Sequence, residues 1–129
     1  TKINSNIKST LIENFIFSIT MEGFLVITDY KTGNIIRITD IFRTFIRDYL
    51  LDFKEAVRTK MLPIGFVVGT KNIYLTTDQG LLIVIDIVTG KTQSVLKLAR
   101  YSGRTKLSRP FALNKNLFII KNNAILKLK

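Results

Sequence analysis

The chain has 129 residues, 47% of them hydrophobic and 22% charged, a composition typical of a folded domain rather than a disordered segment. It contains no cysteine and no histidine, which excludes disulfides, thiolate catalysis, and the commonest metal ligand and general base. No apolar run in the sequence approaches the roughly 20 residues that a membrane-spanning helix needs.

The net charge is strongly positive, at +11 from 20 Lys and Arg residues against 9 Asp and Glu residues. A basic balance of this size can indicate a nucleic-acid or anionic-membrane partner. Here the cations are scattered among Ile and Asn residues without a block of five or six, so we expect no nucleic-acid binding. The chain begins with Thr and shows no signal peptide, which leads us to expect a processed or excised part of a longer protein.

The N-terminal third of the chain predicts a small antiparallel sheet. An outer or linking strand is expected near Leu11 and Ile12, followed by apolar strands at 15–19 and 24–28. A turn that ends at Gly23 separates these two strands, and a second turn at 31–34 leads into a strand at 35–38. Short runs rich in β-branched residues and punctuated by Gly are typical of strands joined by tight turns.

Residues 40–60 break this pattern, because their apolar positions recur with the spacing of a helix. The apolar side chains are Phe42, Phe45, Ile46, Tyr49, Leu50, Phe53 and Val57. Asp40 or Thr39 is suitable as an N-terminal cap. The sequence therefore predicts one helix over about residues 41–58, inserted between groups of strands.

This helix has more than one interpretation. Its apolar face can simply pack on the strands, which is the commoner arrangement. Alternatively it binds a partner protein, since Arg and aromatic side chains are favoured at interface hot spots. The candidate partner-binding residues are Phe42, Arg43, Phe45, Arg47, Tyr49 and Arg58. A role at a membrane surface is a third option, although the polar face carries acidic as well as basic residues.

The second group of strands begins near Gly65 and repeats the first. Gly80 lies 57 positions after Gly23, and the apolar runs on either side superimpose at the same spacing. That spacing also relates the residues of the following turn, which are Asp29 and Asp86, Thr32 and Thr89, and Gly33 and Gly90. A third, shorter copy begins at Asn116, 44 positions after Asn72. The 13-residue difference between the two spacings is about what one inserted helix needs.

The repeated turn residues have a structural explanation. Asp29 and Asp86 could be taken as a catalytic carboxylate pair, but they occupy equivalent repeat positions, where a strand-end Asp accepts N–H bonds from its own turn. Gly80 and Gly90 match neither a dinucleotide-binding nor a phosphate-binding loop. We therefore expect no catalytic, cofactor-binding or metal-binding residues.

Hairpins that return at intervals near 45 residues predict an all-β fold, a partial β-propeller. The chain is long enough for about two and a half blades of antiparallel four-stranded sheets, in a single domain over residues 1–129. Closed propellers have at least about four blades, so the chain is expected to be part of a longer propeller or to associate with other copies. Exposed strand edges favour such self-association.

The repeat resembles a known family. An apolar strand, a polar turn ending in Gly, a strand ending in Asp and a Thr-Gly pair are similar to the PQQ-like β-propeller repeat. The C-terminal part, with 101–103 (Tyr-Ser-Gly), 108–110 (Ser-Arg-Pro) and a final hairpin, resembles the last blade of BamB-type proteins. One departure is the absence of Trp, since Arg37 and Ser94 stand where the repeat often carries it. The family's lipidated Cys is also missing from this sequence.

The resemblance implies a non-catalytic scaffold, a BamB-like component of outer-membrane β-barrel protein assembly. Its expected partners are other proteins, among them barrel-assembly components, and its expected location is the periplasm at the outer membrane, with membrane association only through the parent protein. The resemblance implies no cofactor. Two alternatives stay open, namely a fragment of a PQQ-dependent quinoprotein dehydrogenase and a generic protein-interaction propeller.

Overall fold

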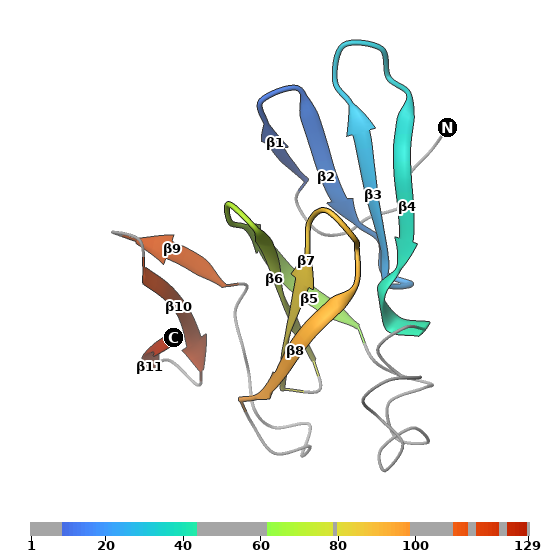
Figure 1. Cartoon of the computed structure of the whole chain (residues 1–129). Helices are drawn as coiled ribbons and strands as arrows, with labels where there is room; N and C mark the ends of the chain where they lie inside the picture. Colours follow the sequence, from blue (N-terminus) through green and yellow to red (C-terminus); the bar gives the residue numbers. More distant parts are fainter. Residues whose placement is uncertain are drawn as a thin grey trace.

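In the computed structural model, the described residues form three antiparallel β-sheets (Figure 1). The structure describes residues 9–43, 62–78, 80–98, 110–113, 116–121 and 124–128. The all-β fold predicted from the sequence is confirmed, with three successive sheets of four, four and three strands in the described residues.

Each sheet is built from strands that follow one another along the chain. Sheet 1 consists of β1 (Thr10–Ile12), β2 (Phe15–Ile19), β3 (Phe24–Asp29) and β4 (Ile35–Asp40). Sheet 2 consists of β5 (Pro63–Val68), β6 (Asn72–Thr77), β7 (Leu81–Asp86) and β8 (Thr92–Lys97). Sheet 3 consists of β9 (Phe111–Leu113), β10 (Asn116–Lys121) and β11 (Ala124–Leu128). Neighbouring strands pair antiparallel, because the short turns between them allow no crossover.

Sheets 1 and 2 are copies of one unit. Ser18 pairs with Val26 in sheet 1, and Leu75 pairs with Ile83 in sheet 2, both at the predicted spacing of 57. The irregularity in the ladder also recurs, between Ile27 and Thr28 in β3 and between the equivalent residues of β7. Equivalent residues can therefore be compared directly between the two sheets.

Sheet 3 repeats the same unit, but its spacing from sheet 2 differs in one strand from the predicted value. The predicted spacing of 44 holds in β10, where Ile119 takes the position of Leu75. In β11 the spacing is 43, because Ile119 pairs with Leu126 whereas Leu75 pairs with Ile83, eight rather than seven positions away. The β10–β11 turn is thus one residue shorter than the β6–β7 turn, and a single spacing for the whole copy was wrong.

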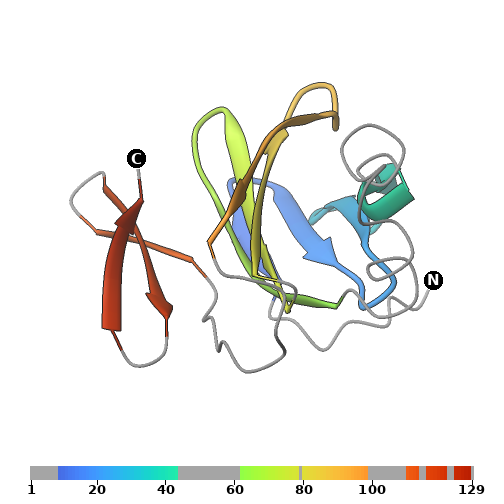
Figure 2. The same cartoon turned by 90° about the horizontal axis from the view of Figure 1, so that it is seen from below.

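Sheet 2 lies between the other two sheets, as both cartoon views show (Figures 1 and 2). Alternate residues of a strand point to opposite faces, so a sheet packed on both sides must be apolar on both. All of β7 from Leu81 to Ile85 is buried accordingly. Its odd-numbered residues belong to the core shared with sheet 1, and Leu82 packs with Ile119 of sheet 3.

The core between sheets 1 and 2 is the larger of the two. It is formed by Phe17, Ile19, Leu25, Ile27, Ile41, Phe42, Phe66, Ile73, Leu75, Leu81, Ile83 and Ile85. Residues 41–43 are helical and follow directly after β4, and two of them, Ile41 and Phe42, belong to this core. The predicted helix begins at this place, and its continuation over 44–58 lies outside the described residues.

The turn between β7 and β8 fits under sheet 1 only because position 90 is glycine. Gly90 and its counterpart Gly33 have nearly the same positive φ, +74° and +75°, which costs any other residue about 1–2 kcal/mol. A Cβ at Gly33 would meet nothing within 4 Å, whereas one at Gly90 would lie 2.8 Å from Oγ1 of Thr39 in β4.

We therefore expect Gly90→Ala to lower the free energy of unfolding by at least about 1 kcal/mol more than Gly33→Ala. Chemical denaturation of both variants measures the difference, and Gly33→Ala supplies the cost of the backbone conformation alone. Equal losses would show that the two sheets do not touch at this turn.

Candidate functional site

The two repeated Asp residues cap their own turns. Oδ1 of Asp29 accepts hydrogen bonds from N–H of Lys31 (2.8 Å) and Thr32 (3.1 Å), and Oδ1 of Asp86 accepts from Val88 (2.8 Å) and Thr89 (2.9 Å). Each of these two carboxylates therefore holds the backbone of its own turn.

The other residues of these turns also make matching hydrogen bonds in the two sheets. N–H of Gly33 donates to the carbonyl of Asp29 at 2.8 Å, and N–H of Gly90 donates to the carbonyl of Asp86 at the same distance. The side chains of Thr32 and Thr89 each accept a hydrogen bond from the second residue after them, at 3.2 Å. In the preceding hairpin turns, N–H of Gly23 and Gly80 donates to the carbonyl three positions earlier.

Asp86 also interacts with residues outside its own turn. The N–H of Thr89 lowers the pKa of the Asp86 carboxyl, with further help from Val88 and from the positive charge of Arg37. Nε2 of Gln93 donates to its second oxygen at 3.0 Å. The carboxylate is therefore ionised at neutral pH, and each of its oxygens has a defined partner.

Arg37 joins the first two sheets. It lies in β4, pairs with Ile27, and sends its guanidinium across to the turn after β7, where it donates to the carbonyls of Ile87 and Val88. Planar guanidinium groups suit such a double contact, because their N–H donors are fixed in a fork. In the sequence, Arg37 is distinguished only by standing where Trp is expected from the resemblance, and no pattern predicted this contact.

The start of the predicted helix is well defined. Oδ1 of Asp40 accepts a hydrogen bond from N–H of Arg43 at 3.0 Å, as an N-terminal cap does. N–H of Ile41 donates to the carbonyl of Gly23 at 2.9 Å, which fixes this segment to the β2–β3 turn. Two of the six candidate partner-binding residues lie in the described part of the chain, and of these Arg43 is exposed, whereas Phe42 is only 8% exposed.

Phe42 packs inside the protein. A Cβ at Gly23 would lie 2.3 Å from its ring, so the aromatic side chain rests directly on the glycine backbone. This is the arrangement expected if the apolar face packs on the strands. The other predicted partner-binding residues, Phe45, Arg47, Tyr49 and Arg58, lie outside the described residues.

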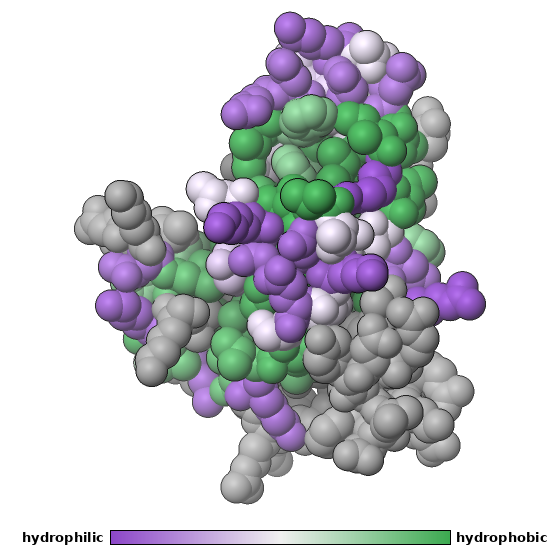
Figure 3. Space-filling view, viewed as in Figure 1, coloured by the Kyte–Doolittle hydropathy of each residue, from purple (hydrophilic) through white to green (hydrophobic). Residues whose placement is uncertain are grey.

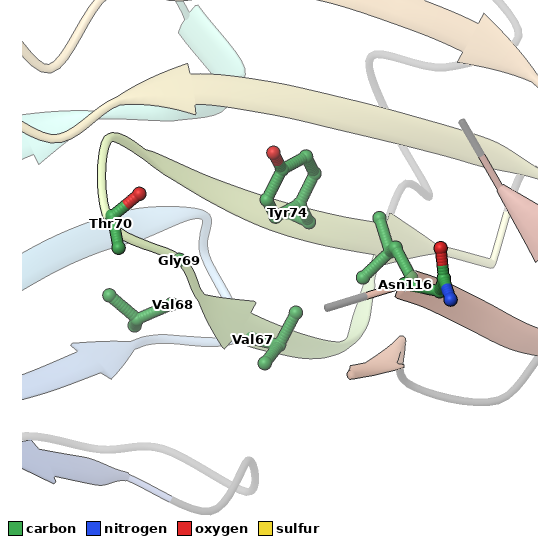
Figure 4. A pocket seen from close by; sticks show the side chains of 7 residues that line it. Val67, Val68, Gly69, Thr70, Tyr74 and Asn116 are labelled. Atoms are coloured by element: carbon green, nitrogen blue, oxygen red, sulfur yellow. The ribbon is translucent and has the colours of Figure 1, made fainter. Parts of the chain in front are cut away.

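A pocket of about 420 Å³ lies where sheet 2 meets sheet 3 (Figure 4). Its wall consists of Val67, Val68, Gly69, Thr70, Tyr74, Asn116 and Leu117. The lining is apolar apart from the hydroxyl and amide groups, and it contains no acid or base. Such a lining can hold an apolar group by contact, and it supplies no group for proton transfer at neutral pH.

Neither a metal-binding cluster nor a membrane-spanning helix occurs in the described residues. No three His, Cys, Asp or Glu side chains there come close enough together to hold a metal ion. None of the helical segments in this part of the chain is long and apolar enough to cross a membrane.

The sequence matches no protein-family model and no curated protein, but solved structures match the fold. BamB from Moraxella catarrhalis superimposes with a TM-score of 0.62 and 13% identity, over 98% of this chain and 32% of that chain. Quinohemoprotein alcohol dehydrogenase from Comamonas testosteroni superimposes with a TM-score of 0.61 and 14% identity, over 93% of this chain and 17% of that chain. Quinohemoprotein alcohol dehydrogenase ADHIIG from Pseudomonas putida HK5 superimposes with a TM-score of 0.62 and 15% identity, over 95% of this chain and 18% of that chain.

The chain has the fold of part of a PQQ-like β-propeller. It spans about a third of BamB and less than a fifth of either dehydrogenase. Identities of 13–15% show the fold alone, and BamB and the two alcohol dehydrogenases are equally similar to this chain. Each sheet of this chain corresponds to one blade, which makes Arg37 a contact between neighbouring blades.

The contact made by Arg37 has no equivalent at the same position of the second sheet. Arg37 occupies a place where the PQQ-like repeat often has Trp, and its guanidinium contacts the turn of the next blade. At the equivalent place in the second blade stands Ser94, which is exposed. The first pair of blades is therefore tied by hydrogen bonds as well as by apolar packing.

We expect Arg37→Met to lower the free energy of unfolding by about 2 kcal/mol, because the substitution keeps the aliphatic stem but removes a charged donor to two carbonyls. Arg43→Met is the matched control, since its exposed side chain should change stability by less than about 0.5 kcal/mol. Urea unfolding of both variants tests this. Equal stabilities would mean that the contact between the blades contributes nothing.

Proposed function

We propose that this chain contributes to a non-catalytic propeller scaffold that binds other proteins, with a role like that of BamB in outer-membrane β-barrel assembly. The supporting observation is the way in which three charged side chains of the blades are used. The carboxylates of Asp29 and Asp86 hold their own turns, and the guanidinium of Arg37 holds two backbone carbonyls. These groups serve to fix the shape of the blades.

A scaffold of this kind acts by holding binding residues in fixed positions. Segments that enter and leave well-packed sheets are positioned by them, and loops on such a framework commonly carry the binding function. The helical segment at 41–43 is one of these, since Asp40 caps it and Gly23 holds its backbone. Arg43 projects from it as an exposed cation.

The charge of the chain indicates the chemistry of the partner. With a net charge of +11, the chain is attracted to an acidic protein surface, and complementary charge raises both the rate and the specificity of association. We place the complex in the periplasm at the outer membrane, as the resemblance to BamB-type proteins implies.

A second candidate function is favoured by the comparisons, because the two dehydrogenase structures superimpose as well as BamB does. In that case the chain would be part of a PQQ-dependent dehydrogenase, whose quinone and Ca²⁺ need acidic and amide ligands converging on the propeller axis. Quinone uptake followed by absorbance tests this alternative. Stoichiometric uptake with dye reduction would contradict the scaffold proposal.

We expect Arg43→Glu to weaken binding to purified barrel-assembly components by about tenfold, since it places a negative charge in the contact. The control is Lys31→Glu, which makes the same change in charge at an exposed turn at the other end of β3 and β4. Surface plasmon resonance measures both affinities. Failure of the unmodified chain to bind any component, or an equal loss in both variants, would overturn the proposal.

A further inference from the structure

The stack of three sheets follows one packing rule. We call the face of sheet 2 that packs on sheet 1 its front face, and the opposite face, which packs on sheet 3, its back face. Equivalent residues define the same two faces in sheets 1 and 3. The back of sheet 1 is covered by the front of sheet 2, and the back of sheet 2 by the front of sheet 3.

The back face of sheet 3 continues this pattern without a partner in the described part of the chain. Ile125 holds the place of Leu82, yet Ile125 is 67% exposed whereas Leu82 is 1% exposed. Ile120, which pairs with Ile125, is also exposed. Beside them the rings of Phe111 and Phe118 stack with their centroids 5.7 Å apart.

The front face of sheet 1 is exposed along its outer strands, although Ser18 and Val26 at its centre are buried. Ile38 holds the place of Val95, and Leu11 holds the place of Val68. Both valines pack against the core between the sheets, whereas Ile38 is 56% exposed and Leu11 is 53% exposed. Val26, at the centre of this face, is buried, so the exposed apolar surface lies along the outer strands β1 and β4.

Figure 3 shows one side of the surface, with hydrophobic area over the strands of sheet 1 and on sheet 3 and hydrophilic residues over the turns. Exposed apolar area of this kind at both ends of a stack is unusual for a monomer and marks an interaction site. The interface that would cover it is already present twice within the chain, as the front of one sheet on the back of another.

We propose that the back face of sheet 3 in one copy of this chain packs on the front face of sheet 1 in a second copy. A front face from the same repeat is the kind of surface that covers each back face within the chain. The contact is head-to-tail, because the two surfaces differ, and such contacts build rings when the rotation closes.

The net charge of the chain gives this association a salt dependence that can be measured. Each copy carries +11, so the copies repel one another while the apolar faces attract. Salt screens the repulsion between surface charges and strengthens hydrophobic burial only slightly at moderate concentration. Assembly should therefore tighten as sodium chloride rises from about 0.05 to 0.5 M, the opposite of a contact held by ion pairs.

The test uses two variants that each damage one face, Ile125→Lys on the back of sheet 3 and Ile38→Lys on the front of sheet 1. Val88→Lys is the control, since Val88 is 81% exposed in the β7–β8 turn and the change in charge is identical. Analytical ultracentrifugation over a concentration series gives the masses. Circular dichroism establishes that each variant is folded, and Ile125→Ser and Ile38→Ser replace any that is not.

The proposal predicts oligomers for the unmodified chain and for Val88→Lys, and monomers for each face variant alone. A mixture of the two face variants should form a dimer and nothing larger, because one intact front and one intact back face remain. The proposal is overturned if the unmodified chain is monomeric at about 0.5 mM, if either face variant assembles normally alone, or if the mixture gives no dimer. Binding of separately produced propeller blades by a monomeric chain would identify a different polypeptide as the occupant.

Discussion

The packing of sheet 1 on sheet 2 is the constraint on which the rest of the structure depends. Alternation along β7 sends Ile83 and Ile85 into the core with sheet 1 and Leu82 into the contact with sheet 3. A one-residue slip of this strand would exchange its two faces. The tight turns at either end of β7 prevent such a slip. The residues of these turns therefore also determine which face of β7 meets each neighbouring blade.

The turn after β7 does more than reverse the chain. It presents two carbonyls to Arg37 and a glycine to Thr39, so that the first blade closes over the second at this point. The second interface lacks this contact, since Ser94 and Leu96 stand in place of Arg37 and Thr39 and are both exposed. The first two blades are therefore joined by contacts that the second interface does not have. The helical residues 41–43, with the exposed Arg43, follow directly after the last strand of the first blade.

The sequence was sufficient to predict what is local and repeated. The hairpins, the Asp-capped turns and the spacing of 57 depend on neighbouring residues, and they are visible as patterns in the chain. Two contacts join residues that are far apart in sequence, namely Arg37 with the carbonyl of Val88 and the ring of Phe42 with Gly23. No pattern in the sequence predicts either contact. The shortened turn before β11 was missed because a third copy without its second turn offers no glycine to align. The roles proposed for Phe45, Arg47, Tyr49 and Arg58 stay predictions, because these residues lie outside the described part of the chain.

The central claim is that three equivalent sheets stack as blades, with adjacent residues of β7 facing different neighbours. Nuclear Overhauser contacts between methyl groups in selectively labelled protein test it most directly. The account predicts contacts from the methyls of Leu82 to Ile119 in sheet 3, and from those of Ile83 to Leu25 or Ile27 in sheet 1. Contacts from Leu82 and Ile83 to the same neighbouring sheet would contradict it.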